Sequence, residues 1–116
     1  MGKILLRAIN RPVFRRIRNI RYTKEKQYAK NMSTIVSLFD GSSVFFIETI
    51  FGDDLIKAVP NIEKYVGRYN TILKQLKNAR YIALPDEGIT MSDGHHLNEK
   101  GHSALCERII VAIGAN

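Results

Sequence analysis

Two short apolar segments with a helical segment between them constrain the fold of this 116-residue chain more than any other feature. Residues 43–49 and 79–84 are dense in β-branched and aromatic residues, which is typical of buried strands. Apolar residues recur at helical spacing in 61–77, and the same period is present in 25–39 and 98–113. Strands that alternate with helices predict the α/β class, with a short parallel sheet covered by helices.

The number of strands bears on how the chain is organised. A free-standing doubly wound domain usually has about four or five strands, whereas this sequence shows two clear ones. We therefore expect the first half of the fold to come from elsewhere, either from an upstream segment or from a partner chain. A homodimer that pairs through the free edges of the sheet is one such arrangement.

Single residues mark where these segments begin and end. Asn61 and Asn98 each precede a helical segment and are expected to act as its N-cap. Residues 51–60 are expected to form a loop, closed by a proline. The only cysteine, Cys106, lies on the apolar face of the last helix and is expected to be buried. A single cysteine also excludes an internal disulfide and a cysteine-based zinc site.

Positive charge is concentrated at the N-terminus. Residues 1–30 contain ten lysines and arginines against one acidic residue, whereas residues 31–116 contain eight against ten. Within the basic part, four apolar residues at helical spacing form a stripe: Ile9, Val13, Ile17 and Ile20. The sequence therefore predicts two units, a basic amphipathic helix in residues 1–24 and an α/β domain in residues 25–116.

The basic helix has three interpretations, and the residues alone leave them open. It is a solvated face that packs on further structure, an interfacial helix on an anionic membrane surface, or a non-specific nucleic-acid contact. No motif favours specific nucleic-acid recognition. No apolar run reaches the ~18–20 residues that span a bilayer, and the run at Ile4-Leu5-Leu6 is too short for a secretion signal. The chain as written is therefore expected in the cytoplasm.

The segment Ser92-Asp93-Gly94-His95-His96-Leu97-Asn98 carries the residues best suited to chemistry. It follows the second predicted strand, at the carboxyl end of the sheet, where open α/β folds place their sites. A turn can bring the carboxylate of Asp93 against one nitrogen of His96, three residues later. The other nitrogen then points outward as a base, which is the arrangement found in nucleophilic triads.

This segment resembles the C-terminal block of the SGNH (GDSL-like) hydrolases, which show Asp-x-x-His, then Leu or Pro, then Asn and a nearby Gly. Asp93, His96, Leu97, Asn98 and Gly101 fall in register with that pattern. The resemblance implies that His96 is the general base and Asp93 its orienting carboxylate. It also implies a flavodoxin-like three-layer α/β/α fold, of which residues 25–116 would be the C-terminal part, and acyl or acetyl esters as substrates.

The other blocks of that family are missing from the sequence. There is no Gly-Asp-Ser nucleophile block, no second glycine block and no Gly-x-Asn-Asp block. The segment Gly52-Asp53-Asp54-Leu55 has aspartate in place of the serine, and we interpret it as a coincidence. The first hypothesis is therefore a C-terminal fragment of an SGNH-type serine ester hydrolase that is inactive alone.

Two alternatives use other features of the chain. The first is a non-catalytic module that docks through its basic helix on an anionic membrane or an acidic partner. The second is a metal site, because His95, His96 and His102 lie with Asp93 within ten residues. Adjacent histidines on a loop are expected to point apart, and His102 is expected to pack beside the last helix. We therefore expect neither a metal nor another cofactor.

Overall fold

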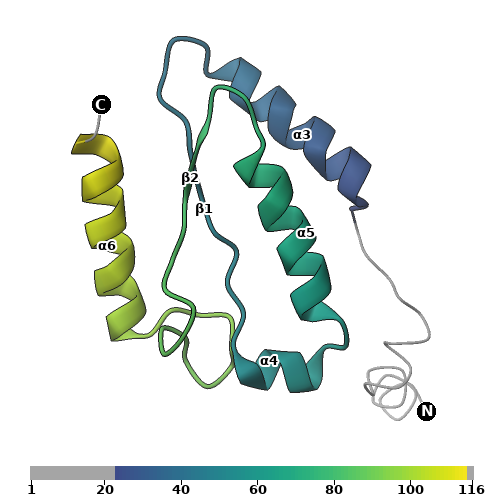
Figure 1. The fold of residues 1–116 in the computed structure, drawn as a ribbon, viewed down its shortest axis with the longest axis vertical. Helices are drawn as coiled ribbons and strands as arrows, with labels where there is room; N and C mark the ends of the chain where they lie inside the picture. The colour runs from purple at the N-terminus through teal and green to yellow at the C-terminus, as the bar shows by residue number, and fades with distance from the viewer. Residues whose placement is uncertain (1–22, 115–116) are drawn as a thin grey trace, which may run out of the picture.

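The computed structural model describes residues 23–114. These residues form the three helices and two strands that were expected there, and one further helix, Asp53–Ala58. The predicted basic helix at 1–24 lies outside the described residues, apart from Thr23 and Lys24, which are not helical. The elements are labelled in Figure 1: α3 (Glu25–Leu38), β1 (Phe45–Ile47), α4 (Asp53–Ala58), α5 (Ile62–Lys74), β2 (Arg80–Ile82) and α6 (Glu99–Gly114).

The two strands pair in parallel, so the predicted α/β class with a short parallel sheet is confirmed. Phe46 lies opposite Tyr81 at the centre of the ladder. The strands are shorter than the apolar runs because a side chain replaces the ladder after Ile47. The Glu48 amide still donates to the Ile82 carbonyl, but the Leu84 amide donates to the Glu48 carboxylate at 2.7 Å.

Each strand pairs only with the other among residues 23–114, so each keeps one free edge in this part of the chain. The connection between them passes through α4 and α5, as a parallel pair requires. None of the helices between residues 23 and 114 combines the length and apolar character needed to cross a bilayer.

The prediction of a loop at 51–60 is wrong, because residues Asp53–Ala58 form α4. Gly52 occupies the N-cap position. Two aspartates in the first turn stabilise the helix, because their negative charges lie at the positive end of the helix dipole. Asn61 occupies the predicted N-cap position of α5, but its side chain does not cap the helix. Asn61 adopts a left-handed conformation with φ 64° and makes no side-chain cap hydrogen bond. It serves instead as the turn between α4 and α5, a conformation that asparagine tolerates.

The apolar core lies between α3, α5 and β2. Val36 of α3 and two residues of α5, Val66 and Leu73, are buried together with Ile82 of β2. In the view of Figure 1, α3 and α5 lie on one side of the strand pair and α6 lies on the other. The core therefore fixes the strand ends beyond which the functional residues lie.

The final helix is covered only in part. Cys106 is exposed, which contradicts the expectation that it is buried. Ile110, Val111 and Ile113 are 64%, 67% and 57% exposed. The reason is that a sheet of two three-residue strands is too small to cover the apolar side of a 16-residue helix within the described part of the chain. The first turn of α6, in contrast, is tightly packed through the buried Gly101.

Candidate functional site

Residues 88–98, which we call the histidine loop, follow β2 and lead into α6. The loop closes on itself through an antiparallel bridge between Thr90 and Leu97. The Met91 amide donates to the His96 carbonyl at 2.8 Å, and the Asn98 amide donates to the Ile89 carbonyl at 2.9 Å. These bonds give the loop a defined shape although it contains no regular strand.

Asn98 joins the histidine loop to α6. Its Oδ1 accepts a hydrogen bond from the Gly101 amide at 2.8 Å, which confirms the predicted N-cap. Its Nδ2 donates to the carbonyls of Gly88 and Thr90 at 3.0 and 3.1 Å. The Asn98 side chain therefore forms hydrogen bonds with one amide in the first turn of α6 and with two carbonyls at the start of the histidine loop.

A backbone contact joins the histidine loop to the start of α4. The Gly52 amide donates to the Gly94 carbonyl at 2.6 Å. Gly94 has φ +75°, and a Cβ there would lie 2.9 Å from the Leu55 amide nitrogen, so a larger residue would not fit. The segment that begins at Gly52 thus has a structural role, which the sequence interpretation missed.

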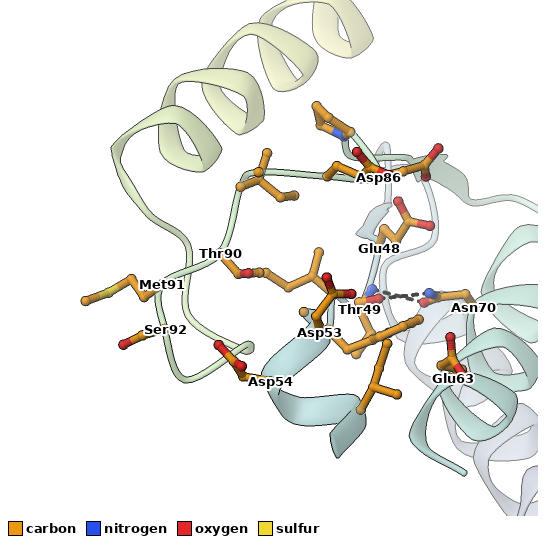
Figure 2. Close-up of a pocket in the computed structure, with 18 residues that line it drawn as sticks. Glu48, Thr49, Asp53, Asp54, Glu63, Asn70, Asp86, Thr90, Met91 and Ser92 are labelled. Atoms are coloured by element: carbon orange, nitrogen blue, oxygen red, sulfur yellow. Dashed lines mark hydrogen bonds between the residues drawn. The ribbon is translucent and has the colours of Figure 1, made fainter. Parts of the chain in front are cut away.

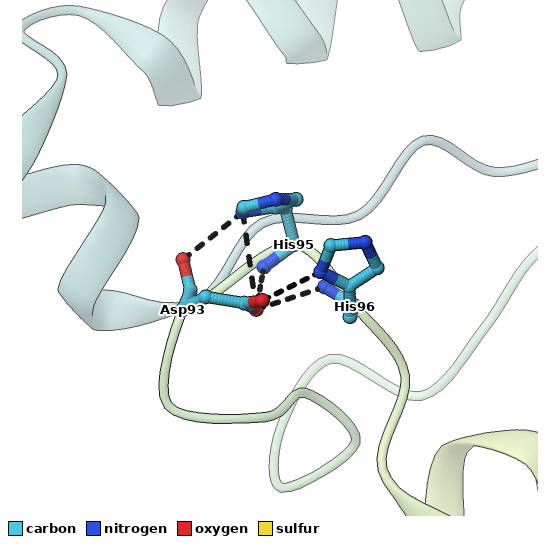
Figure 3. A group of neighbouring side chains, drawn as sticks. All are labelled: Asp93, His95 and His96. Carbon is cyan, nitrogen blue, oxygen red and sulfur yellow. Dashed lines mark hydrogen bonds and ion pairs between the residues drawn. The ribbon is translucent and has the colours of Figure 1, made fainter.

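The carboxylate of Asp93 performs two tasks at once, as Figure 3 shows. Its Oδ1 accepts hydrogen bonds from the backbone amides of His95 and His96, both at 3.0 Å. Its Oδ2 lies 2.5 Å from Nδ1 of the His96 imidazole. The contact expected from the three-residue spacing is therefore present, and the same carboxylate builds the turn that creates it.

These hydrogen bonds fix the protonation of the pair. The His95 amide, the His96 side chain and the His96 amide, in that order, lower the pKa of Asp93 below its ordinary value. An ionised carboxylate can only accept hydrogen bonds, so Nδ1 of His96 must be the donor. In a neutral imidazole the lone pair then resides on Nε2. Among residues 23–114, no hydrogen bond occupies Nε2, and the side chain is 66% exposed.

His95 lies beside His96 and does not point away from it, so that expectation is wrong. The two ring centroids are 4.3 Å apart at an angle of 43°. Nδ1 of His95 lies 3.2 Å from the Asp93 carbonyl oxygen and 3.8 Å from Oδ1. The turn explains this, because it directs both backbone amides, and with them both side chains, toward one carboxylate. His102 lies outside this group. It is exposed on α6, so the expectation that it packs beside this helix is wrong.

A cavity of about 710 Å³ opens at the carboxyl ends of both strands (Figure 2). It is bordered by residues after β1, by α4, by α5 and by the histidine loop as far as Ser92. Asn70 of α5 fixes one wall, because its amide accepts from the Thr49 amide at 3.0 Å and donates to the Thr49 carbonyl at 2.9 Å. We call this space the acidic cavity. Among residues 23–114, its lining contains no lysine or arginine but six carboxylates: Glu48, Asp53, Asp54, Glu63, Asp86 and Glu87.

The acidic cavity was missed by the sequence interpretation. The signal was available, because acidic residues follow both predicted strands and parallel strands end at the same edge of a sheet. Comparison with known protein families, curated proteins and solved structures finds no match for this chain. The features of this chain that bear on its function are therefore the geometry of Asp93 and His96 and the motif that contains them.

Proposed function

We propose that this chain carries the general base and its orienting acid for an SGNH-type serine ester hydrolase. In this proposal residues 25–116 form the C-terminal part of a three-layer α/β/α fold. The observation that carries the proposal is the 2.5 Å contact between Oδ2 of Asp93 and Nδ1 of His96, with Nε2 free of partners among the described residues. Its position at the carboxyl end of a parallel strand pair agrees with this role.

The chemistry follows from the protonation of the pair. A serine hydroxyl placed against Nε2 of His96 gives up its proton as its oxygen attacks the ester carbonyl. The imidazolium that results is stabilised by the ionised Asp93, and it then donates the same proton to the departing alcohol. Water then attacks the acyl-enzyme, with His96 again accepting the proton, and the acid is released as the serine regains its proton. Acyl or acetyl esters are the substrate class.

The serine and the oxyanion donors are not supplied by residues 23–114. The sequence contains no Gly-Asp-Ser block, and no serine hydroxyl in this part of the chain bonds to His96. The described residues therefore provide two of the three triad members. Oxyanion donors usually contribute a large share of the rate enhancement, so we expect the 116-residue chain alone to hydrolyse nitrophenyl acetate no faster than free imidazole does.

The direct test is a graft. Residues 88–102 replace the corresponding segment of an active SGNH hydrolase, whose own serine and oxyanion donors remain in place. We expect the graft to hydrolyse nitrophenyl acetate, with kcat lowered by several orders of magnitude in His96→Ala and in Asp93→Asn. His102→Ala is the matched control, since this exposed histidine of the same segment lies outside the pair. A graft that folds but shows no dependence on His96 contradicts the proposal.

A second measurement uses the unaltered chain. Nitrogen-15 spectra of the imidazoles report which ring nitrogen carries the proton in the neutral form. We expect Nδ1 in His96, because Asp93 accepts from that atom at 2.5 Å, and loss of this preference in Asp93→Ala. A neutral His96 protonated on Nε2 would refute the orienting role of Asp93 whatever the outcome of the graft.

A further inference from the structure

Three side chains of the histidine loop direct one donor atom each at the same small volume (Figure 3). One ring nitrogen of His95, one ring nitrogen of His96 and a carboxylate oxygen of Asp93 all lie within 4.8 Å of one another. The His96 nitrogen is 2.5 Å from Oδ2, and the His95 nitrogen is 3.8 Å from Oδ1. Such convergence of two imidazoles on one carboxylate is the arrangement of ligand atoms around a metal ion.

We propose that Asp93, His95 and His96 bind a divalent transition metal ion, with Zn²⁺ as its occupant. Two imidazole nitrogens and one carboxylate oxygen suit Zn²⁺, Ni²⁺ and Cu²⁺, whereas Mg²⁺ and Ca²⁺ prefer oxygen ligands alone. The side chains are 38%, 52% and 66% exposed in the order Asp93, His95, His96. This exposure leaves the fourth position of a tetrahedral ion open to water.

The adjustment that the ion requires is small. Bonds of about 2.0–2.1 Å to a tetrahedral Zn²⁺ place neighbouring ligand atoms about 3.3 Å apart. One carboxylate oxygen of Asp93 must reach that distance from both ring nitrogens, whereas Oδ2 now lies 2.5 Å from His96 and Oδ1 lies 3.8 Å from His95. We expect rotation of these exposed side chains to bring one oxygen to both nitrogens, while the backbone of the loop stays anchored through Asn98 and Gly94.

Charge and protonation also favour the site. The carboxylate of Asp93 places a negative charge beside the two imidazoles, which favours a cation there. When Zn²⁺ binds Nδ1 of a neutral His96, the proton leaves that nitrogen for solvent and another is taken up at Nε2. Coordinated water is displaced, and no net proton is released by this ring. A protonated imidazole must instead release one proton, so binding weakens as the solution becomes acidic.

The metal site does not depend on the hydrolase proposal, but the two uses of His96 exclude each other. A metal ion on Nδ1 breaks the hydrogen bond to Asp93 and leaves Nε2 carrying a proton. His96 can then no longer accept a proton from a nucleophile. Zinc bound at the histidine loop would therefore switch off the base in any assembly that uses it.

In the experiment the full chain is titrated with Zn²⁺ in a non-coordinating buffer at pH 7.5, and calorimetry measures the heat of binding. All variants are made in a Cys106→Ser background, because Cys106 is exposed and a free thiol can bind zinc by itself. We expect His95→Ala to weaken binding by at least about tenfold, since even the hydrogen-bonding partners of metal ligands matter to that extent. His95→Ala leaves the Asp93–His96 contact intact. His102→Ala is the control and should keep the affinity of the parent.

Nitrogen-15 spectra of the same samples give a second readout. Zinc is expected to move the proton of His96 from Nδ1 to Nε2, and Mg²⁺ at the same concentration is expected to leave it unchanged. The proposal is overturned if His95→Ala binds Zn²⁺ as tightly as the parent, or if His102→Ala weakens binding as much as His95→Ala. It is also overturned if zinc leaves the imidazole signals of His96 unchanged. Each of these results leaves the hydrolase proposal standing.

Discussion

Replacement of Gly101 by alanine tests how the histidine loop is held against α6. A Cβ at this position would lie 2.3 Å from the Ile89 carbonyl oxygen and 2.8 Å from Cδ2 of Leu97. The carbonyl cannot move freely, because it accepts the hydrogen bond from the Asn98 amide at 2.9 Å. The clash is therefore with fixed backbone, and the first turn of α6 must shift away from the loop.

The magnitude combines two opposing effects. Forcing an extra methyl group into a packed site costs about 1–3 kcal/mol. Alanine in a helix is favoured over glycine by roughly 0.5–1 kcal/mol. The clash with Ile89 is the larger effect, so we expect Gly101→Ala to lower the free energy of unfolding by about 1–2 kcal/mol. Loss of the Asn98 cap, worth about 1 kcal/mol, adds to this if the shift breaks it.

Gly67 provides a matched control of opposite sign. It is an exposed residue of α5, and a Cβ there would have no neighbour within 4 Å among the described residues. Gly67→Ala should therefore raise the free energy of unfolding by roughly 0.5–1 kcal/mol. Urea unfolding followed by circular dichroism measures both variants against the parent. If Gly101→Ala is as stable as the parent or more stable, the close approach of α6 to Ile89 is wrong.

Three further perturbations follow from the same contacts. Asn98→Ala removes three hydrogen bonds and should destabilise the chain by about 1–3 kcal/mol in urea unfolding, whereas an unchanged midpoint would contradict the capping role. Asn70→Ala leaves the backbone amide and carbonyl of Thr49 without their partner, so a similar loss of stability is expected in urea unfolding. A smaller loss in Asn70→Asp would show that the hydrogen bond from the Thr49 amide, which aspartate can still accept, contributes to stability. The pKa of Asp93 is lower when folded than its unfolded value of about 3.9, so its stabilising effect is present above about pH 4 and is lost as the pH falls below it. The stability difference between the parent and Asp93→Asn should accordingly narrow below pH ~4, and a difference that stays constant down to pH ~3 would contradict this.

The order of helices and strands could be predicted from the sequence because each segment has a clear apolar period. The exception is α4, whose six residues are too few to show one. The loop expected there was inferred from Pro60, but the helix had already begun at Asp53 and ended before the proline. Cys106 shows a second limit, since the apolar face of α6 was visible in the sequence but the extent of the sheet that covers it was not.

The site was predictable to the extent that it depends on local spacing. The contact between Asp93 and His96 follows from their spacing of three residues on a turn. The cap at Asn98 follows from its place before a helix. The position of His95 and the contact of Gly52 with Gly94 were not predictable, because the first depends on the form of the turn and the second on tertiary structure.

The charges around the acidic cavity bear on what a complete hydrolase site would need. Six carboxylates line this space and no lysine or arginine of the described residues joins them, so this part of the chain makes the local potential negative. That potential opposes the negative oxygen that develops when an ester carbonyl is attacked. The proposed hydrolase would therefore need strong oxyanion donors together with its serine, and an ester of low negative charge is the substrate that we expect to suit this cavity.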